Sequence, residues 1–378
     1  MFMKKNIVMI CITVLLMLLL TSCKNSEETE AADFSRYTKS KRNNAYTEEG
    51  LFCFTDGLIH FISAETGMDT IFCFDPLCLH LPASASNQEP ECMAAGYNNG
   101  TYMAYHEENI YFFVRESFEH QVYKMDINSG ARTLVAELPF SCSITDVVFN
   151  GDYVYYTAAM NTLKNDSING MFGMIEGYNE LIELNLKSGE YRVLTTCGEE
   201  NGGGFADCDV CGGNMFYVLY ESEGRAVYSM SLDTLEPKLE VSPEDFVDKK
   251  YYCGIYNSEN FFYFSKEGDI GIQNIVTDEC KVVHKVELGE EIYLSTVDAG
   301  NGKVYYRTCH GSTEEYEYYL YDMEEKKLWN LTDKCRENRL NLTAYFPYEA
   351  MFEYIVYDES GNGIKGFAPV SEAWLLEE

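Results

Sequence analysis

The sequence predicts an all-β fold for most of the chain, and two observations carry that prediction. The 378 residues include 30 Tyr and 22 Phe but only 2 Trp, and such aromatic side chains fit the pleated, half-buried surface of a sheet. Beyond residue 22 the sequence has no long stretch of helical periodicity, whereas short runs that alternate between apolar and polar residues recur throughout. The part after residue 22 is long enough for one large domain or two ordinary ones.

A short aromatic run recurs along this part of the chain, at a spacing of about 43 to 61 residues. The copies are Leu51–Phe54, Ile110–Phe113, Val154–Tyr156, Met215–Val218, Phe261–Phe264, Val304–Tyr306 and Tyr354–Tyr357. Each run is followed by strands with period-2 alternation, such as 121–127 and 181–186, and several of these end in tight turns such as Asn128-Ser129-Gly130.

A repeated unit of four short antiparallel strands is typical of the blade of a β-propeller. We expect a seven-bladed propeller, with units at about 37–75, 99–139, 143–196, 205–241, 250–286, 291–331 and 341–376. Six or eight blades fit the same signals, because outer strands are weakly marked. The aromatic run is expected as an inner strand, apolar on both faces because blades stack face to face. The first and last units look incomplete, which predicts one blade closed jointly by both termini.

The first 22 residues have the pattern of a signal peptide, in which a short basic end precedes a short apolar run. Lys4 and Lys5 come before the apolar stretch from Ile7 to Leu20, which is too short for a comfortable membrane span of about 20 residues. The sequence Leu20-Thr21-Ser22-Cys23 resembles the lipobox of bacterial lipoproteins. That resemblance implies cleavage before Cys23 and attachment of lipid, with fatty acids such as palmitate, to this cysteine.

The predicted organisation is therefore a signal peptide at 1–22, a lipidated flexible tether at 23–36 and a β-propeller domain at 37–378. The tether is polar and poor in apolar residues, which suits a flexible linker. The protein would be held by its lipid at the extracytoplasmic face of the cell membrane. Its formal charge of −33 repels nucleic acid and anionic headgroups. We expect a monomer that binds no nucleic acid.

Together, these features resemble a broad class of tyrosine-rich β-propeller lipoproteins, in which a phrase of the form turn, Val-Tyr-Tyr, alternating strand and Thr-Gly or Ser-Gly turn repeats. The resemblance covers roughly residues 40–378. It implies a closed ring of blades with a ligand surface at the loops of one face. It implies no activity, because propellers carry many unrelated functions.

One cysteine cluster has the composition of a metal site. Cys73, Cys78, His80 and Cys92 supply three thiols and an imidazole, a donor set that suits a closed tetrahedral zinc site with a structural role. Pro76 can set a turn that brings Cys73 toward Cys78, and Cys78 and His80 share one side of an extended chain. Similar segments in related propeller lipoproteins imply a shared structural element between the first two blades. A Cys73–Cys78 or Cys78–Cys92 disulfide with His80 at the surface is the alternative.

The remaining cysteines leave more than one interpretation open. With Cys11 in the signal and Cys23 lipidated, twelve of the fourteen remain, an even number that outside the cell first suggests disulfides. Cys53 lies within an aromatic strand, where a thiol can act as a small core residue. Cys208 and Cys211 form a CxxC pair in a predicted strand, and redox chemistry, a local disulfide and unpaired thiols are all open for it.

No catalytic motif is evident, so we expect a non-enzymatic binding or scaffold module. Its ligand would be an envelope protein, a peptide or a glycan. Two other functions stay open: an enzyme that acts on glycans, as a lyase or glycosidase, and a substrate-capturing partner of a transporter. His106 and His284 are expected to face solvent.

The longest insertion, 160–178, falls between the second and third strands of the third unit. Its apolar side chains could form an adaptable lip for a ligand, or they could fold back on the blade. The predicted ligand-binding residues are Met160, Met171, Phe172 and Met174.

Overall fold

The chain divides into two units, Met1–Asp33 and Phe34–Glu378, and every residue described below belongs to the second. The computed structural model describes residues 37–40, 44–47, 49–55, 57–63, 65–82, 92–96, 102–116, 119–138, 143–161, 177–198, 204–221, 224–242, 251–257, 259–274, 277–289, 291–311, 315–347, 351–357 and 363–369. In this part of the chain, no helix is long and apolar enough to cross a membrane.

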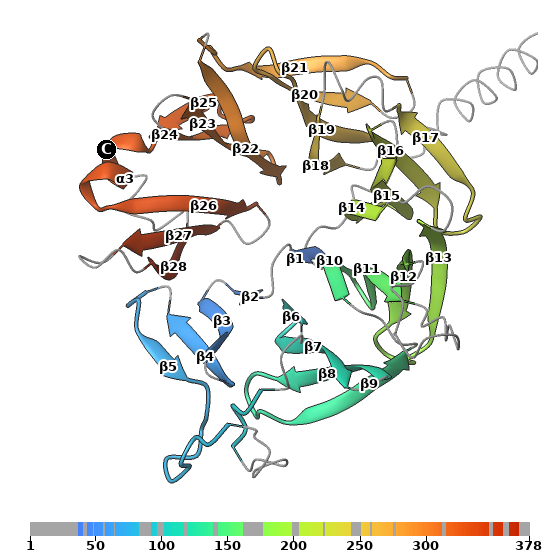
Figure 1. The fold of residues 1–378 in the computed structure, drawn as a ribbon, viewed down its shortest axis with the longest axis vertical. Helices are drawn as coiled ribbons and strands as arrows, with labels where there is room; N and C mark the ends of the chain where they lie inside the picture. The colour runs from blue at the N-terminus through green and yellow to red at the C-terminus, as the bar shows by residue number, and fades with distance from the viewer. Residues whose placement is uncertain are drawn as a thin grey trace, which may run out of the picture. The chain divides into compact units, whose positions relative to one another are not determined.

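The described strands form seven antiparallel sheets, which are numbered here in chain order (Figure 1). The first contains β2 (Ala45–Tyr46), β3 (Gly50–Thr55), β4 (Leu58–Ser63) and β5 (Asp69–Ile71). The second contains β6 (Tyr102–His106), β7 (Asn109–Glu116), β8 (Glu119–Asp126) and β9 (Arg132–Leu138). The third contains β1 (Tyr37–Ser40), β10 (Ser143–Asn150), β11 (Tyr153–Asn161), β12 (Gly177–Asn185) and β13 (Tyr191–Cys197).

The remaining four sheets follow the same order of strands. The fourth contains β14 (Gly204–Cys211), β15 (Asn214–Glu221), β16 (Gly224–Ser231) and β17 (Pro237–Val241). The fifth contains β18 (Tyr251–Asn257), β19 (Asn260–Phe264), β20 (Asp269–Asn274) and β21 (Cys280–Lys285). The sixth contains β22 (Ile292–Gly300), β23 (Lys303–His310), β24 (Glu315–Asp322) and β25 (Lys327–Asn330), and the seventh contains β26 (Leu340–Phe346), β27 (Met351–Tyr357) and β28 (Gly363–Pro369). A short helix, α3 (Thr332–Glu337), links the last two.

Each sheet shares a hydrophobic cluster with the next. The second and third sheets, for example, enclose Phe113, Phe149 and Tyr156, all at most 1 % exposed. Comparable clusters join the other neighbouring sheets, and one more, in which Tyr46 stacks on Phe346, joins the seventh sheet back to the first. Among the described residues, the clusters therefore run around a closed ring (Figure 1), which confirms the predicted all-β propeller fold.

Each aromatic run lies in a strand that pairs with a neighbour on both sides, so it is an inner strand of its sheet, as expected. They form β3, β7, β11, β15, β19, β23 and β27. The first strands of neighbouring sheets contact one another around the middle of the ring.

The expectation that both termini close one blade jointly is wrong for the described strands. The N-terminal strand β1 pairs with β10, with Tyr37 opposite Asn150 and Ser40 opposite Val147. It becomes the innermost strand of the third sheet, whereas the first sheet begins only at Ala45. The Tyr102 hydroxyl holds β1 from the neighbouring sheet by donating to the Ser40 carbonyl oxygen at 2.7 Å.

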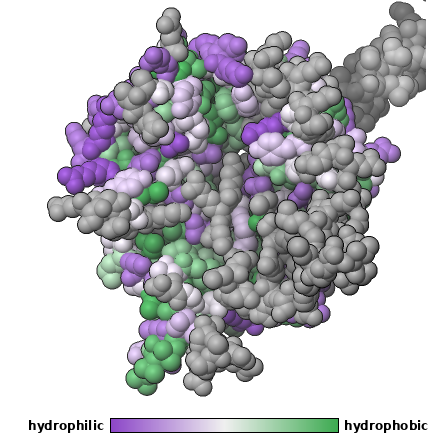
Figure 2. Space-filling model, in the orientation of Figure 1, coloured by the Kyte–Doolittle hydropathy of each residue, from purple (hydrophilic) through white to green (hydrophobic). Residues whose placement is uncertain are grey.

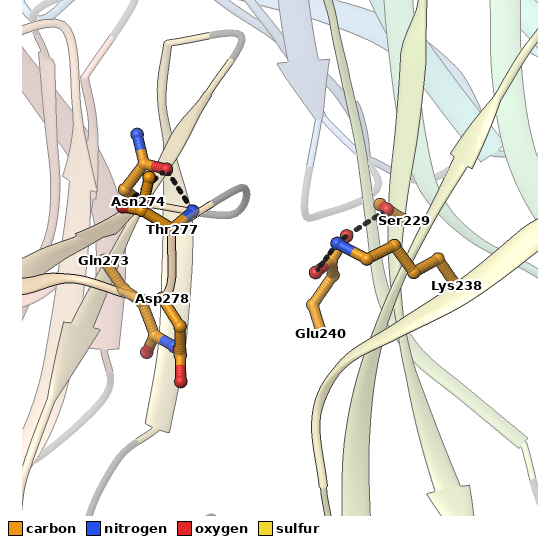
Figure 3. A network of polar contacts seen from close by, with 7 residues as sticks. All are labelled: Ser229, Lys238, Glu240, Gln273, Asn274, Thr277 and Asp278. Carbon is orange, nitrogen blue, oxygen red and sulfur yellow. Dashed lines mark hydrogen bonds and ion pairs between the residues drawn. The ribbon is translucent and has the colours of Figure 1, made fainter.

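Side-chain hydrogen bonds fix the outer hairpins of individual sheets (Figure 3). In the fifth sheet, Asn274 Oδ1 accepts a hydrogen bond of 2.8 Å from the backbone N–H of Thr277, at the turn that leads into β21. In the fourth sheet, the Glu240 carboxylate accepts from the Ser229 hydroxyl and, at 2.8 Å, from Lys238 Nζ. These contacts lie within one sheet each, so they stabilise hairpins and do not join blades.

Candidate metal centre

The cysteine loop, defined here as residues 73–92, leaves the first sheet after β5 and returns to the same sheet. Phe72 N donates to the Ile59 carbonyl oxygen at 2.9 Å on the way out, and Ile59 N donates to the Ala94 carbonyl oxygen at 2.7 Å on the way back. Both ends of the loop therefore pair with the start of β4. This pairing brings Cys73 and Cys92, nineteen positions apart in the sequence, together at the base of the loop.

The returning segment is also anchored to the second sheet. Arg132 Nη2 donates to the carbonyl oxygens of Met93 and Ala95, at 2.6 and 2.7 Å. The guanidinium group lies 5.4 Å from the centre of the Phe112 ring, a cation–π distance. Because Arg132 belongs to β9, the base of the cysteine loop is fixed to two sheets of the ring at once.

The outgoing part of the loop forms a tight turn. Asp75 Oδ1 accepts from Leu77 N at 2.8 Å, and the Asp75 carbonyl oxygen accepts from Cys78 N at 3.2 Å. His80 N points at Cys78 Sγ at 3.4 Å, and His80 has a φ of 51°. This left-handed conformation is uncommon outside Gly and persists only where the surroundings impose it. The turn therefore places the Cys78 thiol and the His80 ring on the side that faces Cys92.

The structure brings together all four residues that the sequence predicted as metal ligands. The sulfur atoms of Cys73, Cys78 and Cys92 and a ring nitrogen of His80 lie within 4.8 Å of one another, and Cys92 Sγ is 3.7 Å from His80 Nδ1. All three cysteines are free thiols. A tetrahedral zinc site with Zn–S bonds of about 2.3 Å holds its ligand atoms roughly 3.8 Å apart, so a small contraction of this cluster would enclose the ion.

The chemistry of the donor set fits a soft cation. Burial and the neighbouring Cys78 thiol raise the pKa of the Cys92 thiol to about 11, because crowded sulfur atoms resist carrying negative charge together. A bound metal ion would favour the deprotonated thiolates and so offset this rise in pKa. Within the described part of the chain, this cluster is the only group of three or more His, Cys, Asp or Glu residues that could hold a metal ion.

The CxxC pair has a different environment. Cys208 and Cys211 lie in β14, as the sequence predicted, and both are buried and free. Successive residues of a strand point to opposite faces, so positions three apart face away from each other. The Cys208 thiol contacts the Asp146 carbonyl oxygen at 3.3 Å. Burial raises the pKa of both thiols, that of Cys211 to about 12, the opposite of what a reactive redox pair needs.

Two histidines differ from expectation. His106 is 1 % exposed; its ring stacks on Phe149 at 4.6 Å and its Nε2 lies 3.0 Å from the Gly151 carbonyl oxygen. His284 is half-buried between the fifth and sixth sheets, where it stacks on Tyr321 at 4.5 Å. In each case an aromatic ring of the adjoining sheet covers the imidazole, Phe149 for His106 and Tyr321 for His284.

The predicted lipidation residue and most of the predicted ligand-binding residues are not described by the structure. Cys23, Met171, Phe172 and Met174 lie outside the described residues. Met160 pairs with Tyr178 through the backbone, near the end of β11, and the insertion does fall between the second and third strands of its unit.

The sequence did not point to an ion-pair cluster near the middle of the ring. Lys39 Nζ lies 2.7 Å from Asp207 Oδ1 and 3.1 Å from Asp209 Oδ2. Lys39 and Asp209 are 8 % and 1 % exposed. The pairing joins positions about 170 residues apart, which no local pattern reveals. The one usable signal was the Asp-x-Asp spacing in a strand, which puts Asp207 and Asp209 on the same face.

A larger open groove lies between the fifth and sixth sheets. It has a volume of about 900 Å³, within the range of small-molecule sites. Its lining mixes apolar, polar and charged side chains, among them Tyr256, Asn260, Val282, Tyr321 and Lys326. Cys280, which is exposed, borders it as well. The groove offers a ligand surface in a part of the chain where the sequence indicated none.

Comparison with known proteins supports the fold alone. No family model matches the chain, and no curated protein matches it. Among solved structures, an oligogalacturonate lyase in complex with manganese has a TM-score of 0.53 at 10 % identity, over 89 % of this chain and 91 % of its own. The oligogalacturonate lyase of Vibrio parahaemolyticus has a TM-score of 0.55 at 11 % identity, over 91 % and 92 %.

A peptidase resembles the chain only in part. Prolyl oligopeptidase B from Galerina marginata has a TM-score of 0.56 at 10 % identity, over 90 % of this chain but only 50 % of its own. At identities this low, the likeness of all three structures shows a shared fold and carries no information about activity. This chain is therefore similar to the β-propeller of enzymes.

Proposed function

We propose that the protein is a lipid-anchored, extracytoplasmic β-propeller that acts as a non-enzymatic binding module, with a structural zinc ion in its cysteine loop. Each of the seven sheets would be one blade. The lipobox at Leu20–Cys23 supports the anchor. The groove between the fifth and sixth sheets would take the ligand, a peptide or glycan of the envelope, because its volume of about 900 Å³ lies within the range of ligand-binding sites.

The observation that carries the zinc site is the convergence of four soft ligand atoms within 4.8 Å. Four protein ligands would complete the tetrahedron and leave no position for a substrate or water. Such closed sites stabilise structure, whereas catalytic zinc keeps an open position. The donor set therefore supports a structural role.

The test is metal analysis of the protein without residues 1–23, purified under anaerobic conditions, together with a count of free thiols after denaturation. We expect one zinc per chain, and loss of zinc in His80→Ala. The His310→Ala variant is the matched control, because His310 lies at the end of β23 and outside the cysteine loop. Absence of metal, with two of the three thiols oxidised, would replace the zinc site by a disulfide.

The anchor has its own test. In the full-length chain expressed in bacteria, Cys23 should incorporate an alkyne-tagged palmitate, and Cys23→Ala should incorporate none and appear in the medium. Equal labelling of both would contradict lipidation at this position.

A second candidate, a lyase of oligogalacturonate, is favoured by one observation: two solved lyases match nearly their whole length to this chain. Two physical arguments oppose it. Oligogalacturonate is a polyanion, and a chain with a formal charge of −33 repels it. Manganese prefers oxygen-rich ligand sets over thiolates. Release of unsaturated uronides from oligogalacturonate, followed at 235 nm, would establish the lyase and displace the binding module.

A further inference from the structure

The cysteine loop carries an exposed apolar tip. Leu77 and Leu79 are 87 % and 81 % exposed, and Phe74 and Leu81 are both more than half exposed. Figure 2 shows a green projection at the lower edge of the view, where Figure 1 draws the loop that follows β5. Large apolar side chains are rarely left in water together without a purpose.

The tip and the metal cluster share one piece of backbone. From Leu77 to Leu81 the side chains alternate: Leu77, Leu79 and Leu81 are exposed, whereas Cys78 and His80 between them are half-buried and face Cys92. Fixing Cys78 and His80 in a metal cluster would therefore fix the three leucines in a fan that points away from the ring. A bound metal ion would therefore hold the exposed leucines of the tip in place.

We propose that this tip inserts into the outer surface of the lipid bilayer, an inference that rests on the proposed lipid anchor. Thirteen residues lie between Cys23 and Tyr37, and the fourteen residue-to-residue steps from one position to the other reach up to about 50 Å. A strand of nine residues, such as β12, is only about 30 Å long. The anchor would therefore keep the domain close enough for any of its faces to contact the bilayer, at a high effective concentration.

Two further properties suit lipid better than a protein groove. Residues 72–82 contain one formally charged side chain, Asp75, in a chain with a net charge of −33, so the tip itself adds little to the repulsion between this acidic protein and an anionic membrane. The backbone N–H groups of Leu77, Cys78 and His80 are all bonded within the loop. Unbonded N–H groups could not enter an apolar phase without a penalty.

The experiment measures co-sedimentation of the non-lipidated protein, residues 24–378, with vesicles of phosphatidylcholine. We expect saturable binding, weakened when phosphatidylglycerol is added. The double variant Leu77→Ser/Leu79→Ser should lose at least about tenfold in partition coefficient, because burial of one leucine is worth about that factor. The control Leu239→Ser/Leu328→Ser removes leucines that are 48 % and 44 % exposed on outer strands, and it should bind within twofold of the wild type.

Failure of this inference can be told apart from failure of the proposed function. If the protein holds zinc but does not bind the vesicles, or binds them equally with and without Leu77 and Leu79, insertion is wrong. If the protein holds no zinc yet binds through the leucines, the metal site is wrong and the tip stands.

Discussion

The protein has two polar clusters, one near the middle of the ring and one on its rim, and they differ in composition. The first pairs carboxylates with an ammonium group, and the second gathers thiols and an imidazole. In the middle, Asp207 and Asp209 have the ammonium group of Lys39 within 3.1 Å. On the rim, the thiols of Cys73, Cys78 and Cys92 and the ring of His80 bring their ligand atoms within 4.8 Å of one another. The inner cluster takes an ammonium group from its own chain, whereas the proposed metal site would take its cation from solution.

The difference follows from where each cluster sits. The cavity beside Lys39 and Asp209 has a volume of only about 20 Å³, room for a single water, so an ion cannot easily enter. The cysteine loop is at the surface, where an ion can reach it. A buried charge must be paired during folding, whereas soft ligands in a surface loop would bind a metal ion after the chain has folded.

Breaking the inner cluster should have the largest effect. Lys39→Ala would leave two carboxylates, one of them 1 % exposed, without their counter-charge, and we expect the free energy of unfolding to fall by about 3–5 kcal/mol. Urea unfolding at pH 7 measures it. The control is Lys187→Ala, because the Lys187 side chain is 75 % exposed and pairs with Asp152 at 2.6 Å; an exposed pair contributes about 1 kcal/mol or less. Equal losses in the two variants would mean that burial of the pair does not matter.

His120 is a third buried group, and its surroundings disfavour the charged form of its imidazole. It is 2 % exposed, and burial lowers the pKa of its imidazole to about 4. The unfolded chain, with an ordinary value near 6.5, binds the proton more readily, so stability is full above pH 6.5 and falls as the pH drops toward 4. The shift corresponds to about 3 kcal/mol. In His120→Phe, whose ring would pack between Phe113 and Tyr156, the fall over this pH range should be smaller by that amount; an unchanged pH profile would contradict it.

Metal should change stability at the rim alone. A metal ion that binds only the folded chain raises the free energy of unfolding by about 2.7 kcal/mol when its concentration is 100 times the dissociation constant. We expect this gain in the wild type and in Lys39→Ala, and no gain in His80→Ala. The midpoint of urea unfolding, with zinc or with a chelator, measures it. A zinc-dependent gain in His80→Ala would show that the ion binds elsewhere.

The cysteines show how far residue spacing alone can lead. Cys73, Cys78, His80 and Cys92 have no familiar zinc spacing, yet both ends of their loop pair with β4 and bring them together. Cys208 and Cys211 have a familiar redox spacing, yet they lie three apart in a strand and are buried. Spacing fixes the distance along the chain, and only the backbone conformation turns it into a distance in space.

The sequence by itself determined the all-β propeller architecture, because the repeated aromatic strands must be covered on both faces and only neighbouring sheets of the same kind can cover them. It also singled out Cys73, Cys78, His80 and Cys92, because three thiols and an imidazole in one short segment match the donor set of a zinc site. The tertiary structure alone decided that β1 joins the third sheet, that Lys39 meets Asp207 and Asp209, and that His106 and His284 are covered. Each of these depends on contacts between segments that are distant in sequence, and local periodicity does not encode them.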